Sequence, residues 1–407
     1  MTEDMLEEGT SRVLAPDFVP RKIGPMLSHA EVDGDFVQVT WRDGLAGRFH
    51  SCYLRENDVG SAIDPETREK TLDIADLPLE ARIVAAEVSG TRLSLRFDDG
   101  AVTYHNGDWL RDIKAGHHLP HSDVPSRYAW DASDMPEPVS FDGPTVLSSD
   151  EALFDFLTAT HRYGLARLRG LGSADGTVRK VAEKIGIVRS SSFGFLFDVE
   201  NKPNPDSAAY TGQALSAHTD LPTRELQPGL QLLHCRDNSC PDGYSTMVDG
   251  FRIADEVRET DHAAFDALTS LNWIFTNRHP DFDYRFSAPV VALEKNCEVS
   301  EIRIANALRA EPDMPEARIS EAYRSLRLFM TLALDPRFVC RYPFEPGDLV
   351  IFDNRRVLHG RDGFNPNDGY RRLQGCYVDR DDLFSRLRVL ARNARACAST
   401  GNAAAAE

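Results

Sequence analysis

The pattern of apolar and polar positions divides the chain into a strand-rich first part and a longer part that mixes helices with strands. Residues 36–41 alternate apolar and polar side chains, as a half-buried strand does, and residues 43–44 supply a turn. Two further alternating stretches lie within residues 83–97, and another covers residues 101–104. These short strands predict a small β-rich N-terminal domain over residues 31–115.

Helical spacing of apolar residues appears after a polar segment at residues 116–138, which is rich in proline and histidine and which we interpret as a linker. Serine and acidic residues at 148–151 are typical of a helix start, and Gly164 is placed to end that helix. Residues 165–168 then predict a short strand, and residues 176–185 a second amphipathic helix.

Beyond residue 205 strands and loops dominate, with helical patterns near residues 251–270 and 314–328. A β-rich core with helices beside it indicates an α+β fold or a jelly roll, which we assign to residues 139–395. The two ends of the chain are expected to form an extended arm and a disordered tail, at residues 1–30 and 396–407.

Charge and composition narrow the possible functions. The 407 residues include 64 acidic and 46 basic side chains, a formal net charge of −18. Such a surface repels phosphate backbones and anionic lipid, so neither nucleic acid nor a membrane is an expected partner. The N-terminus lacks a signal-peptide pattern, and the seven cysteines are scattered and form no CxxC pair. We therefore expect reduced thiols and a cytoplasmic location.

Three residues suggest a metal site. Residues two apart in a strand point the same way, so a strand over residues 215–222 would present His218 and Asp220 together. A single His-x-Asp is weak in a chain with 12 histidines. However, an apolar strand expected to run from Leu349 to His359 ends in a third candidate ligand. Two histidines and a carboxylate suit Fe(II) enzymes that leave coordination positions open for cosubstrate and O₂.

One arginine, Arg371, is placed where it could bind a cosubstrate carboxylate. Arg371 comes shortly after His359 at the start of another expected strand, where its guanidinium could hold a dicarboxylate in a bidentate manner. The neighbouring Arg372 is the competing candidate.

The order of these residues resembles the taurine dioxygenase-like 2-oxoglutarate oxygenases. More narrowly, residues 31–392 resemble the γ-butyrobetaine hydroxylase and trimethyllysine hydroxylase branch. The segments that carry this resemblance are residues 41–44, 53–57, 218–220, 228–235, 248–251, 352–354, 358–361, 371–377 and 385–390.

The resemblance implies a double-stranded β-helix (jelly-roll) catalytic domain behind the small N-terminal domain, assembled as a homodimer. It makes His218, Asp220 and His359 the iron ligands, with Arg371 and Thr246 binding 2-oxoglutarate. The implied reaction is C–H hydroxylation with Fe(II), 2-oxoglutarate and O₂, which releases succinate and CO₂, with ascorbate as reductant.

The same branch binds a trimethylammonium group among aromatic rings, since a quaternary nitrogen has no hydrogen to donate and ring faces attract it. The matching positions here are Phe193, Phe197, Tyr210 and Tyr377. The alternative is that Phe193 and Phe197 belong to the hydrophobic core.

The acid end of the substrate site departs from the family pattern. Where γ-butyrobetaine hydroxylases carry polar side chains, this chain has Ser207, Leu221 and Ala305. This difference suggests another anionic group, and our first hypothesis is 2-(trimethylammonio)ethylphosphonate, with γ-butyrobetaine or trimethyllysine as the alternative. Three arginines could bind a phosphonate: Arg278, Arg285 and Arg309. The alternative is that each is an ordinary surface residue.

The N-terminal domain lacks the cysteines that hold a structural zinc in related proteins. His105 matches the expected histidine, but no cysteine lies in residues 57–63, and Cys52 falls outside the cluster. One histidine cannot rebuild a tetrahedral site, so we expect no zinc.

Two functions from other classes compete with hydroxylation. One is a noncatalytic betaine-binding protein on the same fold, which the complete set of iron ligands argues against. The other is a metal-dependent hydrolase that uses the same ligands, which would need a general base and no 2-oxoglutarate.

Overall fold

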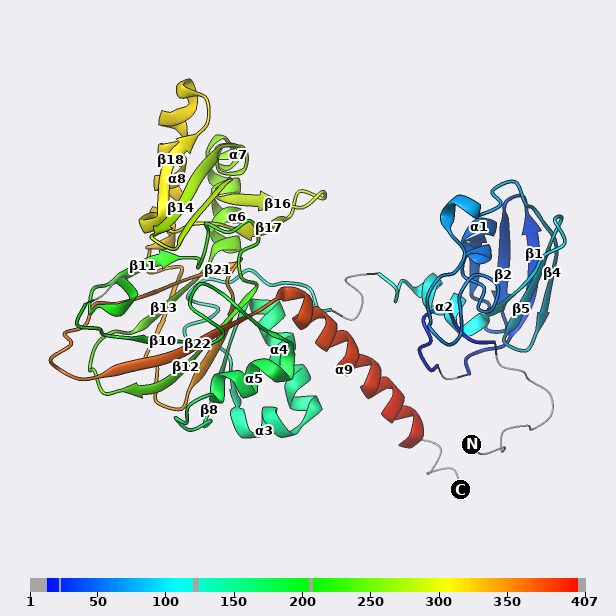
Figure 1. The fold of residues 1–407 in the computed structure, drawn as a ribbon, viewed down its shortest axis with the longest axis horizontal. Coiled ribbons are helices and arrows are strands. Elements are labelled where there is room, and N and C mark those ends of the chain that lie inside the picture. Colours follow the sequence, from blue (N-terminus) through cyan, green and yellow to red (C-terminus); the bar gives the residue numbers. More distant parts are fainter. Residues whose placement is uncertain (1–12, 22, 120–123, 205–207, 402–407) are drawn as a thin grey trace. The chain divides into compact units, whose positions relative to one another are not determined.

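The computed structural model describes residues 13–21, 23–119, 124–204 and 208–401, with side chains described as far as residue 394. The chain divides into two compact units (Figure 1). One consists of residues 1–123 with 392–407, and the other of residues 124–391. No helix of the described residues is long and apolar enough to cross a membrane.

The smaller unit contains two antiparallel three-stranded sheets in the described residues. The first comprises β1 (Leu27–Asp33), β2 (Phe36–Trp41) and β3 (Ala46–His50), and the second β4 (Ile83–Ser89), β5 (Arg92–Phe97) and β6 (Val102–Asn106). The short helices are α1 (Ser51–Arg55), η1 (Ile74–Asp76) and α2 (Gly107–Ala115). The strands predicted from alternation are thus confirmed, and Gly44 adopts the positive φ of 87° that its turn requires.

A single core joins the two sheets of this unit. Trp41 and Leu93 come from different sheets, and Trp109 from α2, and all three are buried in it. His105 is also buried, and its Nε2 lies 2.9 Å from the Thr103 hydroxyl. Burial lowers the pKa of His105 to about 3, which favours the neutral imidazole, and its Nδ1 has no partner among the described atoms.

Three expected boundaries need correction. Strand β1 begins at Leu27, inside the expected arm, because Leu27 is buried and bonds the carbonyl of Gly90. Residues 124–138 belong to the larger unit, since Trp130 is fully buried there and its indole donates to the carbonyl of Tyr163 at 2.7 Å. Helix α9 (Arg380–Gly401) extends into the expected tail; residues 402–407 lie outside the described residues.

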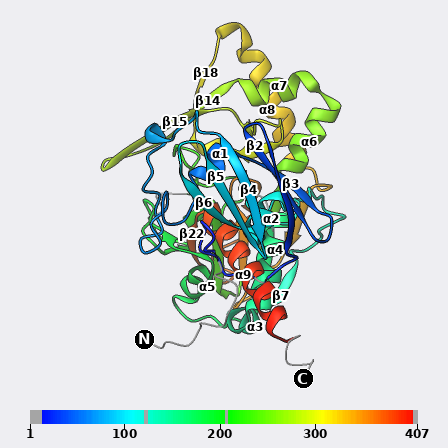
Figure 2. The same ribbon diagram turned by 90° about the vertical axis from the view of Figure 1, so that its right-hand side faces the viewer.

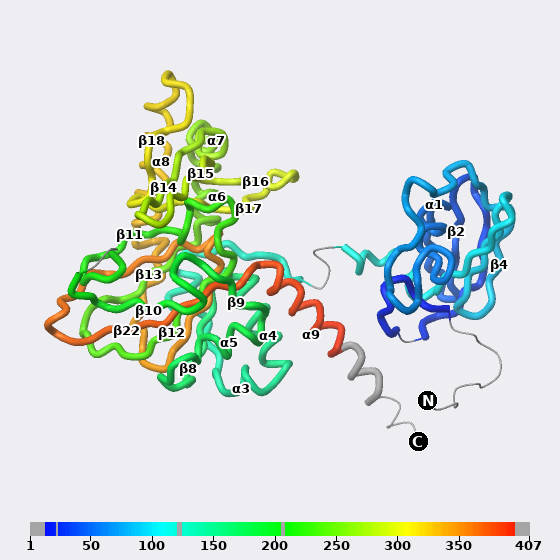
Figure 3. The backbone as a smooth tube through the Cα atoms, in the orientation of Figure 1, coloured from blue at the N-terminus to red at the C-terminus, as the bar shows by residue number. Residues whose placement is uncertain are grey.

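Two sheets form the centre of the larger unit. The larger sheet contains β7 (Ser140–Asp142), β8 (Leu165–Arg169), β9 (Val188–Arg189), β10 (Phe197–Glu200), β12 (Leu230–Asn238), β20 (Leu349–Asp353) and β22 (Arg371–Val378). The smaller contains β11 (Leu215–His218), β13 (Ser245–Asp249), β19 (Val339–Tyr342) and β21 (Val357–Arg361). The tube in Figure 3 shows β10, β22 and β12 running next to one another.

Successive strands alternate between these sheets, for example from β20 to β21 to β22. Side chains of both sheets share one buried cluster: Leu233 and Phe352 from the larger sheet lie with Met247 and Tyr342 from the smaller. This arrangement is consistent with the expected jelly roll, and the mixture of helices and strands agrees with the α+β class.

Helices cover the outer face of each sheet. Beside the larger sheet lie α3 (Gly143–Ser148), α4 (Asp150–Tyr163), α5 (Thr177–Ile185) and the start of α9, which share a second core with it. Beside the smaller sheet lie α6 (Gly250–Thr260), α7 (His262–Ser270) and α8 (Ile319–Ala333), which gather together in both views (Figures 1 and 2). The predicted helices are confirmed, and Ser149 caps α4 by accepting the amide hydrogen of Ala152.

Between α7 and α8 the chain forms smaller strands and 3₁₀ turns. These are β14 (Asn272–His279), β15 (Phe282–Ala288), β16 (Val291–Leu293), β17 (Val299–Ile302), η3 (Asn306–Leu308), β18 (Arg309–Asp313) and η4 (Glu316–Arg318), and η2 (Ala208–Tyr210) precedes β11. Strand β14 lies between β15 and β18 in a separate sheet.

The apolar strand expected to run from Leu349 to His359 is instead two strands. A turn after Asp353 separates β20 from β21 and carries the chain from one sheet to the other. Arg356 in this turn forms a buried bidentate pair with Asp249, at 3.0 and 2.7 Å. Apolar periodicity could not predict the turn, because its polar residues Asn354 and Arg356 are buried. Their side-chain hydrogen bonds are to residues that are distant in the sequence.

This buried pair predicts a large effect on stability. Replacing Asp249 by alanine would leave the Arg356 guanidinium buried without its anion, and we expect the free energy of unfolding to fall by about 3–5 kcal/mol. Denaturant unfolding followed by circular dichroism measures this change. The control is Arg337→Ala, which breaks an exposed pair with Asp335 and should cost about 0–1 kcal/mol. Equal losses in the two variants would contradict the prediction.

Candidate iron and cosubstrate site

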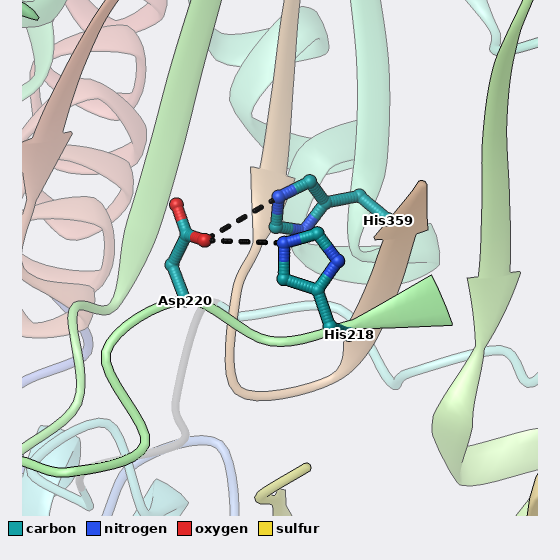
Figure 4. A group of neighbouring side chains, drawn as sticks. All are labelled: His218, Asp220 and His359. Carbon is teal, nitrogen blue, oxygen red and sulfur yellow. Dashed lines mark ion pairs between the residues drawn. The ribbon is translucent and has the colours of Figure 1, made fainter. Parts of the chain in front are cut away.

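Two histidines and an aspartate converge at the end of the smaller sheet (Figure 4). His218 ends β11 and pairs directly with His359 in β21. Asp220 follows in the loop after β11, and its Oδ1 lies 3.5 Å from Nε2 of His218 and 3.6 Å from Nε2 of His359. The three candidate ligand atoms all lie within 4.8 Å of one another.

Asp220 faces the histidines without lying in a strand, which differs from the alternation that we expected. Strand β11 ends at His218, and Leu221 has a positive φ of 52° that turns the chain away. The side chain of Asn354 replaces a strand neighbour: its oxygen accepts the Asp220 amide hydrogen at 2.7 Å, and its nitrogen donates to the Asp220 carbonyl at 3.0 Å. Asn354 is fully buried, so this support is well defined.

The three side chains differ in how burial and their mutual contacts shift their pKa values. Burial opposes ionisation of Asp220, but its electrostatic interactions with His359 and His218 and the hydrogen bonds of His218 and Tyr377 hold the pKa of its carboxyl below the usual range. Burial lowers the pKa of His359 to about 3, which keeps that imidazole neutral. Burial acts in the same direction on His218, but its hydrogen bond to Asp220 raises the pKa of its imidazole overall.

The donor set fits Fe(II). Two imidazoles and one carboxylate that converge on one side are the ligands of non-haem Fe(II) oxygenases, and His218, Asp220 and His359 supply this set. Nδ1 of His218 lies 2.9 Å from the carbonyl of Ser216, a contact that orients Nε2 toward the site.

A buried arginine without an acidic partner lies between the two sheets. Arg371 begins β22 and is 5% exposed, and none of the described acidic residues pairs with it. Its NH2 group is 3.5 Å from the hydroxyl of Ser245 in the facing sheet, and its Nε has no partner among the described atoms. Burial lowers the pKa of this guanidinium, so a bound anion would relieve an unfavourable charge.

A second buried guanidinium makes this region more positive. Arg361 donates to the carbonyls of Thr211 and Gln213, and none of the described acidic groups forms an ion pair with it. Burial and the charge of Arg371 lower the pKa of Arg361 to about 10. Two buried cations without a protein anion favour an anionic ligand.

In the structure Ser245, and not Thr246, faces Arg371. Side chains alternate along β13, and Met247 lies in the cluster between the sheets whereas Val248 contacts the outer helices. Ser245 therefore shares the inner face with Met247, and Thr246 lies on the outer face near Gly360. The sequence did not show this, because the two apolar residues of β13, Met247 and Val248, are consecutive and do not distinguish its two faces.

Arg372 has a different role from its neighbour. It pairs with Asp198 at 2.9 Å and lies 3.6 Å from Glu200, on the less buried side of the larger sheet. Its charge is therefore already matched by protein carboxylates.

Three of the four predicted aromatic residues, Phe193, Phe197 and Tyr377, form a connected cluster beside the iron ligands. Phe193 and Phe197 have ring centroids 5.8 Å apart, and those of Phe197 and Tyr377 are 5.1 Å apart. Phe193 is 43% exposed, which argues against the core alternative for that residue. The Tyr377 hydroxyl donates to Oδ2 of Asp220 at 2.8 Å, so the cluster reaches the metal ligands directly.

Tyr210 and Gly375 differ in their relation to this cluster. Tyr210 is buried, and the ammonium of Lys202 lies 3.5 Å from its ring centroid, whereas no ring contact joins Tyr210 to the other three among the described residues. Gly375 pairs with Phe197, and a Cβ at this position would lie only 2.5 Å from the Phe197 ring. A glycine is therefore needed for the phenyl ring to lie across β22.

The structure gives less support to the expected anion site for a phosphonate. Arg278 and Arg285 are exposed on the β14–β15 hairpin and both pair with Asp283. Arg309 stacks on Trp273, with the guanidinium carbon 4.7 Å from the ring centroid. Of the three positions that differ from the family, Leu221 and Ala305 are buried and Ser207 lies outside the described residues.

Comparisons with known proteins agree with this geometry. The family model for "Taurine catabolism dioxygenase TauD, TfdA family" matches residues 123–377. The chain is 42% identical to γ-butyrobetaine dioxygenase of Pseudomonas sp. (strain AK-1), over 91% of this chain and 97% of that one. It is 27% identical to γ-butyrobetaine dioxygenase of Homo sapiens, over 87% and 94% of the two chains. For the mitochondrial trimethyllysine dioxygenase of Gallus gallus, identity is 28%, over 88% and 87%.

Fold, site and relatives together define a dioxygenase that depends on Fe(II), 2-oxoglutarate and O₂. The chain belongs to the TauD, TfdA family, within the branch that contains the γ-butyrobetaine and trimethyllysine dioxygenases.

The unpaired Arg371 gives a direct prediction for the cosubstrate. Arg371→Met should raise the KM for 2-oxoglutarate by about 10- to 100-fold, because a hydrogen bond to a charged group contributes about 1.5–3 kcal/mol. Succinate formation at varied 2-oxoglutarate measures the change. The adjacent Arg372→Met is the matched control and should leave this KM near the wild-type value. Similar increases in both variants would show that Arg371 has no special role.

Proposed function

We propose that this protein hydroxylates γ-butyrobetaine, with His218, Asp220 and His359 as ligands of Fe(II). The observation that carries the proposal is the aromatic cluster that reaches an iron ligand through Tyr377. A box of rings beside the metal suits a small substrate with a quaternary ammonium group, since each ring face can contribute roughly 0.5–2 kcal/mol. The identity of 42% with a γ-butyrobetaine dioxygenase over nearly the whole chain favours this substrate.

This choice reverses the order of our first hypotheses. The phosphonate substrate rested on changed positions at the acid end and on three arginines, and two of those arginines already share Asp283. Trimethyllysine remains the second candidate, supported by lower identity to the dioxygenases named for it. The intact ligand set and the unpaired Arg371 favour an enzyme over a noncatalytic betaine-binding protein.

Each part of the site would have a physical task. Arg371, with the hydroxyl of Ser245, would hold the far carboxylate of 2-oxoglutarate, while the near end reaches the iron site. When bound, Fe(II) supplies the oxygen chemistry that converts 2-oxoglutarate to succinate and CO₂. Phe193, Phe197 and the ring of Tyr377 would hold the ammonium group, so that a fixed C–H bond faces the metal.

A substrate panel tests the proposal. Purified protein with Fe(II), ascorbate and 2-oxoglutarate would be offered γ-butyrobetaine, trimethyllysine and 2-(trimethylammonio)ethylphosphonate in parallel. We expect the highest kcat/KM with γ-butyrobetaine, measured as succinate formed and one oxygen gained by the substrate. A preference for the phosphonate would restore the first hypothesis, and turnover of trimethyllysine alone would favour the second candidate.

The aromatic cluster, which we call the cage, can be tested with two substitutions in one short segment. Phe197→Leu removes a ring face, and we expect it to raise the KM for γ-butyrobetaine by about 3- to 30-fold. Phe195→Leu is the control, because Phe195 is 54% exposed and has no ring contact among the described residues. A KM that is unchanged in Phe197→Leu would place the ammonium group elsewhere.

The homodimer stays a prediction that light scattering can test.

A further inference from the structure

Tyr377 contacts both the aromatic cluster and the iron ligand Asp220. Its side chain comes from β22 in the larger sheet and is 1% exposed. The ring lies against Phe197, with centroids 5.1 Å apart, whereas the hydroxyl donates to Asp220 at 2.8 Å. The aromatic cluster and the metal ligands therefore share this one residue.

The two oxygens of Asp220 have different partners. Oδ1 faces Nε2 of His218 and of His359, at 3.5 and 3.6 Å, and is placed to bind a metal between them (Figure 4). Oδ2 faces away from the histidines and accepts the Tyr377 hydrogen bond. This division fixes which oxygen points at the iron site.

The backbone alone leaves this orientation open. Asn354 binds the amide and the carbonyl of Asp220, which fixes the position of its Cα but not the rotation of its side chain. Tyr377 is the hydrogen-bond donor to Oδ2 among the described residues. Its hydroxyl is thus the group that can hold the carboxylate in one rotamer before a metal binds.

We propose that the Tyr377 hydroxyl is a positioning group for the iron ligand Asp220, while the ring of the same residue forms a wall of the substrate cage. Outer-shell hydrogen bonds to metal ligands commonly change metal affinity by roughly 10- to 100-fold, so the hydroxyl should have a measurable effect. The part that concerns the cage rests on the proposed function, whereas the part that concerns Asp220 does not.

The two tasks can be separated by two substitutions. Tyr377→Phe removes the hydroxyl and keeps a ring of nearly the same shape. Phe197→Leu removes a neighbouring ring and leaves the hydrogen bond to Asp220 intact. The first should affect the metal and the second should affect the substrate, although both residues lie in one cluster.

The deciding experiment uses the full-length protein and Mn(II) as a redox-stable probe of the iron site. Free Mn(II) is measured by electron paramagnetic resonance during titration, without 2-oxoglutarate or substrate. Tyr377→Phe should weaken Mn(II) binding by roughly 10-fold or more, while Phe197→Leu binds Mn(II) like the wild type. Wild-type affinity in Tyr377→Phe would overturn the proposal, and an equal loss in Phe197→Leu would reduce it to a general packing effect.

Steady-state kinetics supply the second readout. In Tyr377→Phe the concentration of Fe(II) needed for half-maximal rate should rise, and the KM for γ-butyrobetaine at saturating Fe(II) should change by less than in Phe197→Leu. A larger rise in substrate KM than in the Fe(II) requirement would contradict the assigned roles. If no tested substrate is turned over, the proposed function fails, but the Mn(II) titration still decides the role of the hydroxyl.

Discussion

The pairing of β11 with β21 is the constraint on which the site depends, because it brings His218 opposite His359. The two residues are far apart in the sequence, and no local signal could hold their imidazoles in place. Pairing through the backbone gives two ligands a fixed separation, and the third is then added by a loop. Asn354, in the turn between β20 and β21, tethers that loop, so the turn between the sheets also places the carboxylate.

Electrostatics distinguishes the functional charges from the structural ones. Arg356 and Asp249 are both almost fully buried and satisfy each other, which is how a folded protein normally tolerates interior charge. Arg371 is buried to a similar degree but lacks a protein anion among the described residues. A buried guanidinium without a carboxylate partner destabilises the unliganded protein. Binding of a dicarboxylate removes this unfavourable free energy, which therefore adds to the affinity for the ligand.

Much of this could be predicted from the sequence, and the parts that could not share a cause. Helical and strand periodicity located α4 and β2, and the family motifs identified the two histidines, Asp220 and Arg371. The turn after Asp353 was missed because its polar residues, buried by distant partners, read as a continuation of the strand. The outer position of Thr246 was also missed, because a motif gives a position in the sequence but not the face of the strand.

The hydrogen bond of Tyr377 illustrates the same limit. An aromatic residue in a motif suggests a ring for the cage, and its hydroxyl carries no sequence signal of its own. Only the approach of β22 to the loop after β11 gives that hydroxyl a partner.

Strand β22 also sets the distance between Arg371 and Tyr377. Arg371, Gly375 and Tyr377 lie an even number of residues apart and so face the same side, and an extended strand rises about 3.3 Å per residue. Six steps therefore separate Arg371 from Tyr377 by about 20 Å along the backbone. A single inserted residue would turn one of these groups to the opposite face, and a pair would lengthen the interval by about 7 Å. The length of β22 between Arg371 and Tyr377 thus sets the separation of these two side chains.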